Sequence, residues 1–221
     1  MAKIKDTDYL FASTWIRMLE RNLLTRERMD QMVEARTAED AAKVLTECGY
    51  PEMAAATPSA LEETLSEARR KTFDDLYTSV PDKSIIDVFR IKFDYHNVKV
   101  VLKADAHGLD ADRLLTDTGR MPARALVDAI HQDDLRSIPT RLAHAISEAK
   151  ELLAVTGDPQ QADFALDRAY YEEMSGIART SGSAFLEGYV RLLIDAANLR
   201  SAVRTLRMHK SVDFLKSVLF P

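Results

Sequence analysis

The feature that most constrains the fold is a pattern that occurs twice, once in the middle of the chain and once near its end. Each copy reads arginine, apolar, free position, apolar, aspartate, two free positions, asparagine, apolar, basic, two free positions, apolar, basic. The polar members are Arg90, Asp94, Asn97, Lys99 and Lys103 in the first copy, and Arg191, Asp195, Asn198, Arg200 and Arg204 in the second. A pattern repeated in this way indicates a repeated structural module.

Composition predicts that the module is helical. Glycine and proline are scarce, at 7 residues each among 221, whereas alanine, leucine, arginine, glutamate and aspartate are plentiful. These abundant residues include the strong helix formers, and few turn residues are left for a strand-rich fold. With 46% apolar residues the chain can bury a substantial core. We therefore expect an all-α protein.

Apolar spacing and capping residues predict the helix boundaries. The helix carrying the first copy runs from Asp82 or Lys83 to Gly108 and is about 40 Å long at 1.5 Å per residue. The second copy lies on a helix over 184–210. The other predicted helices are 9–24, two short ones after Thr25 and Thr37, 57–77, two short ones at 111–116 and 122–131, 139–157, 158–181, and 212–220.

The helices group into three predicted modules, which start near Tyr9, Phe93 and Ile194. This division gives a first module over residues 1–82, a second over 83–182 and the beginning of a third over 183–221. The third has its long helix and then reaches Pro221. We interpret the chain as either a shortened piece or an unusually short member of its family.

Charge and cysteine content restrict the class of protein. A net charge of −5 provides no general attraction to nucleic acid or to an anionic lipid surface. The single cysteine, Cys48, forms no internal disulfide, and the first residues show no apolar export signal. No segment approaches the roughly 20 apolar residues of a membrane span. We expect a cytoplasmic protein that reaches a membrane only through protein partners.

The repeated polar residues make specific predictions about contacts. On a helix Asn97 shares a face with Phe93 and Val101, so its amide should be half-buried. Arg90 precedes Asp94 by four residues, which allows an ion pair within the helix worth a few tenths of a kcal/mol. Arg191 and Asp195 have the same spacing.

Each copy also places two like charges four residues apart, at Lys99 and Lys103 and at Arg200 and Arg204. Such pairs repel each other, so they predict acidic partners. The favoured partners are carboxylates on a neighbouring helix of the same module. The alternatives are a docking surface for another protein, or, for residues 204–210, a complement to the negative end of the helix.

Catalytic motifs are scarce, and we expect no catalytic, cofactor-binding or metal-binding residues. No phosphate-binding glycine loop and no serine elbow occurs. Asp128 and His131 share a helix face, but a metal site needs further ligands, so a solvated helix end is the preferred interpretation. A helical metalloenzyme using these two residues is the third-ranked hypothesis. Cys48 has no nearby histidine and is interpreted as a packing residue.

The two copies, Phe93-Asp94-Tyr95-x-Asn97-Val98-Lys99 and Ile194-Asp195-x-x-Asn198-Leu199-Arg200, resemble the C subunit of archaeal and bacterial A/V-type ATP synthases. The d subunit of the vacuolar proton pump is in the same family. Residues 17–26 resemble the family's opening, although Ser13 and Trp15 stand where the later copies have asparagine and a basic residue. The resemblance covers essentially the whole chain, which would hold two of the family's usual three modules and the start of the third.

The resemblance implies an all-helical, funnel-like, pseudo-threefold body without catalysis of its own. It implies a rotor adaptor of the central stalk that seats on the cytoplasmic loops of the membrane proteolipid ring and receives the central shaft of the soluble head. The second hypothesis is a general helical-repeat scaffold for protein binding, which predicts an open solenoid. In either case we interpret the repeated motif as a polar contact between helices rather than a chemical site.

Overall fold

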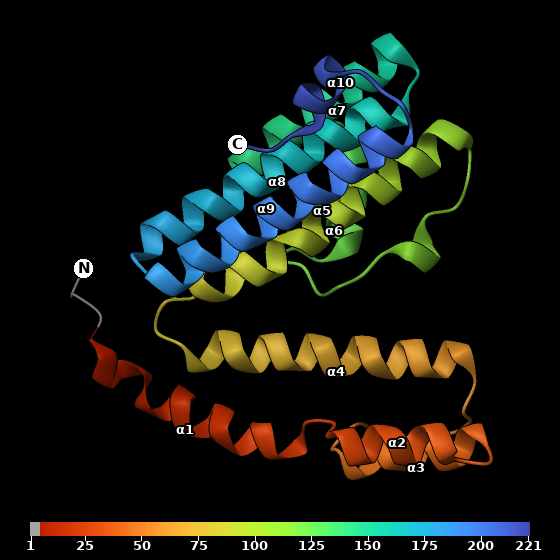
Figure 1. Ribbon diagram of the computed structural model, residues 1–221, viewed down its shortest axis with the longest axis vertical. Coiled ribbons are helices and arrows are strands. Elements are labelled where there is room, and N and C mark those ends of the chain that lie inside the picture. The colour runs from red at the N-terminus through yellow and green to blue at the C-terminus, as the bar shows by residue number, and fades with distance from the viewer. Residues whose placement is uncertain (1–4) are drawn as a thin grey trace. The chain divides into compact units, whose positions relative to one another are not determined.

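The computed structural model describes residues 5–221, which form helices and connecting segments and contain no strand (Figure 1). The predicted all-α class is confirmed. The α-helices are α1 (Leu10–Leu19), α2 (Arg26–Glu34), α3 (Ala38–Glu47), α4 (Pro58–Ser79), α5 (Ser84–His107), α6 (Ala123–His131), α7 (Thr140–Thr156), α8 (Pro159–Ser181), α9 (Ala184–Arg207) and α10 (Val212–Val218). Short 3-10 helices lie at Asp6–Tyr9, Glu20–Asn22 and Asp112–Leu114.

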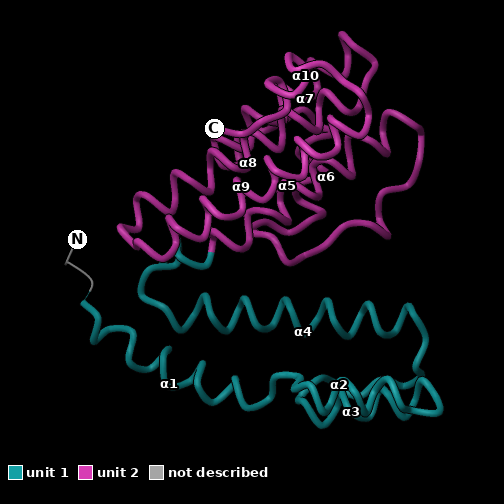
Figure 2. The backbone as a smooth tube through the Cα atoms, viewed as in Figure 1, with its two compact units in different colours: residues 1–86 teal, residues 87–221 magenta. Residues whose placement is uncertain are grey.

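The chain divides into two compact units, one ending at Ile86 and the other running from Asp87 to Pro221 (Figure 2). The two copies of the motif, on α5 and α9, both lie in the second unit. The division into modules 1–82, 83–182 and 183–221 stays a prediction.

Most helices begin where capping residues predict. The Thr37 hydroxyl accepts a 3.1 Å hydrogen bond from the Asp40 amide and so satisfies one of the free N–H groups at the start of α3. Thr57 and Asp158 cap α4 and α8 in the same way, each followed by a proline in the first turn. At the other end of α7, Gly157 adopts the left-handed conformation, with φ of +64°.

The prediction of a helix at 111–116 is wrong. Only Asp112–Leu114 form a single 3-10 turn, and the backbone is extended from Leu115, with ψ of 154°. The segment from Thr116 to Met121 instead lies along α5 and is held by side chains of that helix. Hydrogen bonds from α5 replace those that a local helix would have made.

The core of the second unit is formed by α5, α6, α7 and α8. Val98 and Leu102 of α5 pack with Leu126 and Ile130 of α6 and with Leu142 of α7, all buried. The helices α5, α8 and α9 lie side by side along much of their length (Figure 1), and the rings of Phe89 and Tyr189 meet between α5 and α9 at 5.4 Å.

In the first unit α2 packs against α3, and α1 packs against α4. Ala12, Val80 and Ile86 form a buried cluster there, with Phe73 and Tyr77 against it. Across residues 5–221, no helix has the length and apolar character needed to cross a membrane.

Candidate functional site

Asn97 holds the backbone of Thr116 through both ends of its side-chain amide. Its Nδ2 donates to the Thr116 carbonyl at 2.8 Å, and its Oδ1 accepts from the Thr116 N–H at 3.0 Å. Asn97 is fully buried rather than half-buried as predicted. The partner is an extended segment, so the contact joins a helix to a connecting segment rather than to another helix.

Asn198 makes the same pair of hydrogen bonds in the second copy. Its Nδ2 donates to the Phe220 carbonyl and its Oδ1 accepts from the Phe220 N–H, both at 2.8 Å. Here the asparagine is half-buried. The two asparagines thus have one structural role, each fixing the backbone of a segment that returns along its helix.

Asp94 is fully buried, and its carboxylate accepts hydrogen bonds from Arg120, a partner that the sequence did not predict. The Arg120 Nε donates to Asp94 Oδ2 at 2.7 Å, and the Arg120 backbone N–H donates to Oδ1 at 2.9 Å. Burial raises the pKa of Asp94 above its ordinary value, and the Arg120 guanidinium and the backbone N–H groups oppose that rise. The returning segment thus brings a guanidinium and backbone N–H donors together at one carboxylate, and hydrogen bonds to a charged acceptor are the strong ones.

Arg90 instead holds carbonyl groups of the same segment. Its Nε donates to the Thr118 carbonyl at 3.2 Å and to the Gly119 carbonyl at 3.0 Å, and its Nη2 also donates to the Gly119 carbonyl. The segment therefore lies against one helix face, with Arg90, Asp94 and Asn97 each fixing one part of its backbone. Because Gly119 has no Cβ, its backbone can approach Asp94 closely.

Arg120 extends this contact to α8. Its Nη1 donates to Glu173 Oε1 at 2.7 Å, and the Tyr95 hydroxyl donates to Glu173 Oε2 at 2.9 Å. Burial raises the pKa of Tyr95 far above its ordinary value, and the Glu173 carboxylate adds to the rise, so the phenol stays a hydrogen-bond donor. One arginine between two buried carboxylates connects α5, the returning segment and α8.

The basic residues of the first copy pair with carboxylates of the same unit. Lys99 Nζ lies 2.5 Å from Asp167 Oδ1, and Lys103 Nζ lies 2.6 Å from Asp163 Oδ2. Both aspartates are on α8, so the predicted acidic partners are on a neighbouring helix. Since the later lysine pairs with the earlier aspartate, the two helices run antiparallel.

The second copy lacks such partners. Arg200 Nε donates to the Ala196 carbonyl at 3.2 Å within its own helix, and within residues 5–221 no carboxylate forms an ion pair with Arg200 or Arg204. Both side chains are exposed. Arg191 and Asp195 are also exposed, and they line a cavity of about 350 Å³ beside Asn198 and Phe220.

The apolar residues of the first copy are also buried, whereas the matching residues of the second copy are exposed. Ile91, Val98 and Leu102 of α5 are 0%, 0% and 5% exposed. The residues at the matching positions of α9 are Leu192, Leu199 and Val203, which are 66%, 67% and 41% exposed. A face that forms core in the first copy is therefore open to solvent in the second.

The other candidate residues from the sequence each contact a side chain outside the repeated motif. Asp128 Oδ1 lies 3.5 Å from Arg124 Nε, and His131 Nε2 lies 3.0 Å from Asp105 Oδ1. Within the part of the chain that the structure describes, no group of three histidine, cysteine or acidic side chains is placed to hold a metal ion. Cys48 is buried, with Arg28 Nη1 2.6 Å from its sulfur.

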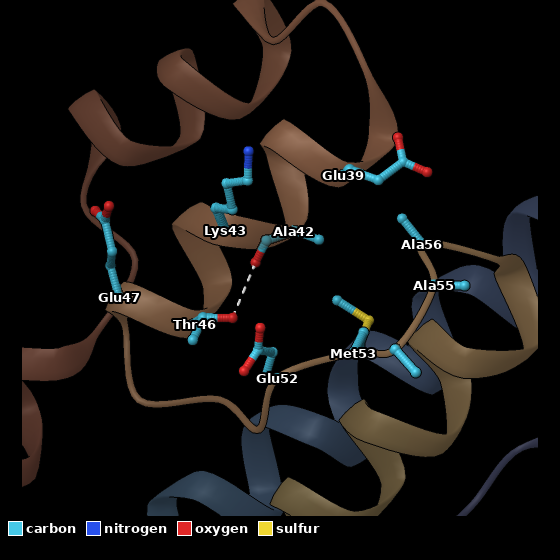
Figure 3. Close-up of a pocket in the computed structure, with 10 residues that line it drawn as sticks. Glu39, Ala42, Lys43, Thr46, Glu47, Glu52, Met53, Ala55 and Ala56 are labelled. Carbon is cyan, nitrogen blue, oxygen red and sulfur yellow. Dashed lines mark hydrogen bonds between the residues drawn. The ribbon is translucent and has the colours of Figure 1, made fainter.

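A separate pocket of about 430 Å³ lies between α3 and residues 52–56 in the first unit (Figure 3). Its polar lining side chains are exposed, among them Glu47, Glu52 and Lys43. Lys43 pairs with Asp40 at 2.9 Å. Such a surface gives a ligand little help in displacing water, so this pocket is not the candidate site.

Sequence reasoning missed Gly119, Arg120 and Glu173. The dipeptide Gly119-Arg120 lies in a segment interpreted as a link between short helices, and Glu173 lies on a helix with many charges. The position of Asp94 on the apolar face of its helix could have predicted Arg120. A buried aspartate requires a cationic partner, which can come from elsewhere in the chain.

Comparisons with known proteins agree with the resemblance. The family model for the ATP synthase (C/AC39) subunit matches residues 12–221. The chain is 26% identical over 205 residues to the C subunit of the V-type sodium ATPase of Enterococcus hirae, covering 92% of this chain and 62% of that protein. It is 25% identical over 229 residues to the C subunit of the A-type ATP synthase of Thermococcus kodakarensis, covering 98% and 62%. The chain thus spans less than two thirds of the length of these relatives.

Proposed function

Because this chain belongs to the ATP synthase (C/AC39) subunit family, we propose that it is a non-catalytic central-stalk subunit of a rotary V-type ATPase or ATP synthase. In this role it joins the central shaft of the soluble head to the cytoplasmic loops of the membrane proteolipid ring. It would act at the cytoplasmic face of the membrane and contact the membrane only through these protein partners. It would transmit torque during ATP-linked ion transport.

The observation that carries the proposal is the exposed face of α9. Phe185, Leu192, Leu199 and Leu206 are exposed by 75%, 66%, 67% and 72% and recur every seven residues, so they share one side of the helix. On α5 the residues that match Leu192 and Leu199 are Ile91 and Val98, which are fully buried, and Val98 packs with α6 and α7. A stripe of large apolar side chains flanked by arginines is typical of a protein interface. This supports a protein that works by assembly.

The test is co-purification of the full chain with the shaft and ring subunits of the rotary complex. We expect the parent chain to retain shaft subunits and Leu192→Glu/Leu199→Glu to lose them, because charge on the stripe opposes burial. Val155→Glu is the matched control, since Val155 is 78% exposed and lies on a different helix, α7. Retention of neither shaft nor ring subunits by the parent chain would contradict the proposal.

A general helical scaffold is the alternative, and solution scattering separates the two shapes. The stalk subunit predicts a closed funnel-like body in the assembled complex, whereas the scaffold predicts an extended solenoid. An elongated scattering profile together with failure to bind the shaft would favour the scaffold.

A further inference from the structure

Asp87, in the first turn of α5, belongs to a cluster of charged side chains that also holds the returning segment, Thr116–Met121. The groups whose charges act on Asp87 come from three elements: Arg90 and Asp94 of α5, Arg120 of the returning segment, and Glu173 of α8. Three carboxylates thus face two guanidiniums. The cluster carries one excess negative charge when every carboxylate is ionised, and none when one of them holds a proton.

Asp87 is the carboxylate best suited to hold that proton. Asp94 accepts hydrogen bonds from the guanidinium and the backbone N–H of Arg120. Glu173 accepts from the same guanidinium and from the Tyr95 hydroxyl. Such bonds favour the ionised form of a carboxyl. By contrast, the buried Oδ1 of Asp87 has no hydrogen-bond partner among residues 5–221. Burial raises the pKa of Asp87, and only nearby guanidinium charges oppose the rise.

We propose that Asp87 is a proton-linked switch for the returning segment. With a proton on Asp87 the cluster is neutral, and the segment stays closed against α5. Loss of the proton buries an excess negative charge, and local opening of the segment relieves this cost by admitting water to the carboxylates. The segment can open at this place because side chains of α5, rather than a regular helix of its own, hold its backbone.

The direction of the pH effect follows from the two states of Asp87. In the closed state the pKa of Asp87 lies above its ordinary value of about 4, to which it returns when water reaches the carboxyl. A proton therefore stabilises the closed state, and that contribution is lost as the pH rises from about 4 through the pKa of the closed state. The segment should open more often as the pH rises above this range.

Native-state hydrogen exchange of the full chain tests the proposal at single amides. The Thr116 N–H is the principal probe, because its acceptor is the amide oxygen of Asn97, which does not titrate. After correction for the intrinsic pH dependence of exchange, its protection factor should fall about tenfold or more between pH 4 and pH 8, the effect of one unit or more of difference in pKa. The Arg120 N–H, held by Asp94, should follow the same curve.

Two variants separate Asp87 from the other titrating groups. Asp87→Asn, whose side chain cannot lose a proton, should remove most of the pH dependence at Thr116 and keep its protection near the acidic value. Asp128→Asn is the matched control, since Asp128 lies on α6 with a side chain that is 50% exposed. This second variant should follow the curve of the parent protein.

A protection factor at Thr116 that is constant or rises with pH would show that the fold accommodates the ionised Asp87 without opening, and it overturns the proposal. So does a pH dependence that survives Asp87→Asn, or one confined to the Arg120 amide, which titration of Asp94 explains. Protection at Thr116 equal at every pH to that of Ile146, buried in α7, would mean that the segment opens only when the whole unit unfolds, and this also overturns it.

This inference goes beyond the stalk role. The isolated chain suffices for the exchange experiment, and its failure leaves co-purification with the shaft unaffected.

Discussion

The backbone of Gly119 lies directly against the carboxylate of Asp94, so that a Cβ built on Gly119 would stand 2.2 Å from Asp94 Oδ1. Gly119→Ala must therefore displace the segment that carries Arg120. We expect a loss of about 2–3 kcal/mol in the free energy of unfolding, the usual cost of forcing extra volume into a packed site. Urea unfolding followed by circular dichroism measures it.

Gly188→Ala is the matched control for that substitution. Gly188 lies within α9, and a Cβ added there would meet no atom within 4 Å, so alanine should stabilise the protein by about 0.5–1 kcal/mol through helix propensity. Equal effects of the two substitutions would show that the approach of Gly119 to Asp94 has no energetic weight.

Replacing the asparagines tests the backbone contacts. Asn97→Leu removes two hydrogen bonds and leaves the Thr116 N–H and carbonyl without partners, which we expect to cost about 2–4 kcal/mol. Asn198→Leu should cost less, because Asn198 is half-buried and water can reach the groups that it leaves. Chemical denaturation of both variants gives the comparison. Two variants as stable as the parent would refute a structural role for the motif.

Arg120 should be the most sensitive residue of the network. Arg120→Met leaves Asp94 buried without its cation, and we expect a cost of about 3–5 kcal/mol at neutral pH. Arg136→Met, which removes an arginine that is 90% exposed and paired with Asp134 at 2.6 Å, should cost less than about 1 kcal/mol.

The loss in Arg120→Met should depend on pH. The Arg120 guanidinium lowers the pKa of Asp94 more than the backbone N–H groups do, so removing it lets burial raise that pKa further. A carboxyl whose folded pKa lies above its unfolded value stabilises the fold at low pH and loses that contribution as pH rises through the folded pKa. Unfolding at pH 5 and pH 7 should therefore show a smaller deficit at pH 5. A deficit that grows toward acid would contradict this reasoning.

Asp87 makes a related prediction in the parent protein. Burial raises its pKa, with Arg120 and Arg90 opposing, and within the described residues its Oδ1 is buried without a hydrogen-bond partner. Folding therefore disfavours the carboxylate form of Asp87. The free energy of unfolding falls for this reason as the pH rises above about 4, the ordinary pKa of an aspartate. Asp87→Asn should gain stability relative to the parent between pH 3.5 and pH 7. A constant difference across that range would count against the buried charge.

The helices and their limits were predictable because the signals for them are local. Thr37, Thr57 and Asp158 cap their helices through amides two or three residues away, and apolar spacing fixes the faces between. The acidic partners of Lys99 and Lys103 were predictable in kind, since repulsion at four-residue spacing needs compensation. Which carboxylates these are, Asp167 and Asp163, follows only from the antiparallel arrangement of α5 and α8 in the structure.

The returning segment could not be predicted from local signals. Residues 111–116 contain good helix formers, yet Asn97 captures the Thr116 backbone from 19 positions earlier in the chain. The pairing of Asp94 with Arg120 could not be predicted for the same reason, because Arg120 lies 26 positions later in the chain, whereas Arg90 is only four positions away. Tertiary contacts here overrule propensity and spacing.

The two asparagine contacts have a consequence for how such a repeat diverges. Asn97 and Asn198 bind only main-chain atoms, and the residues they hold, Thr116 and Phe220, have nothing chemical in common. Any residue other than proline offers the same N–H and carbonyl. Mutation can therefore change the residue that each asparagine holds while the asparagine preserves the geometry of the contact.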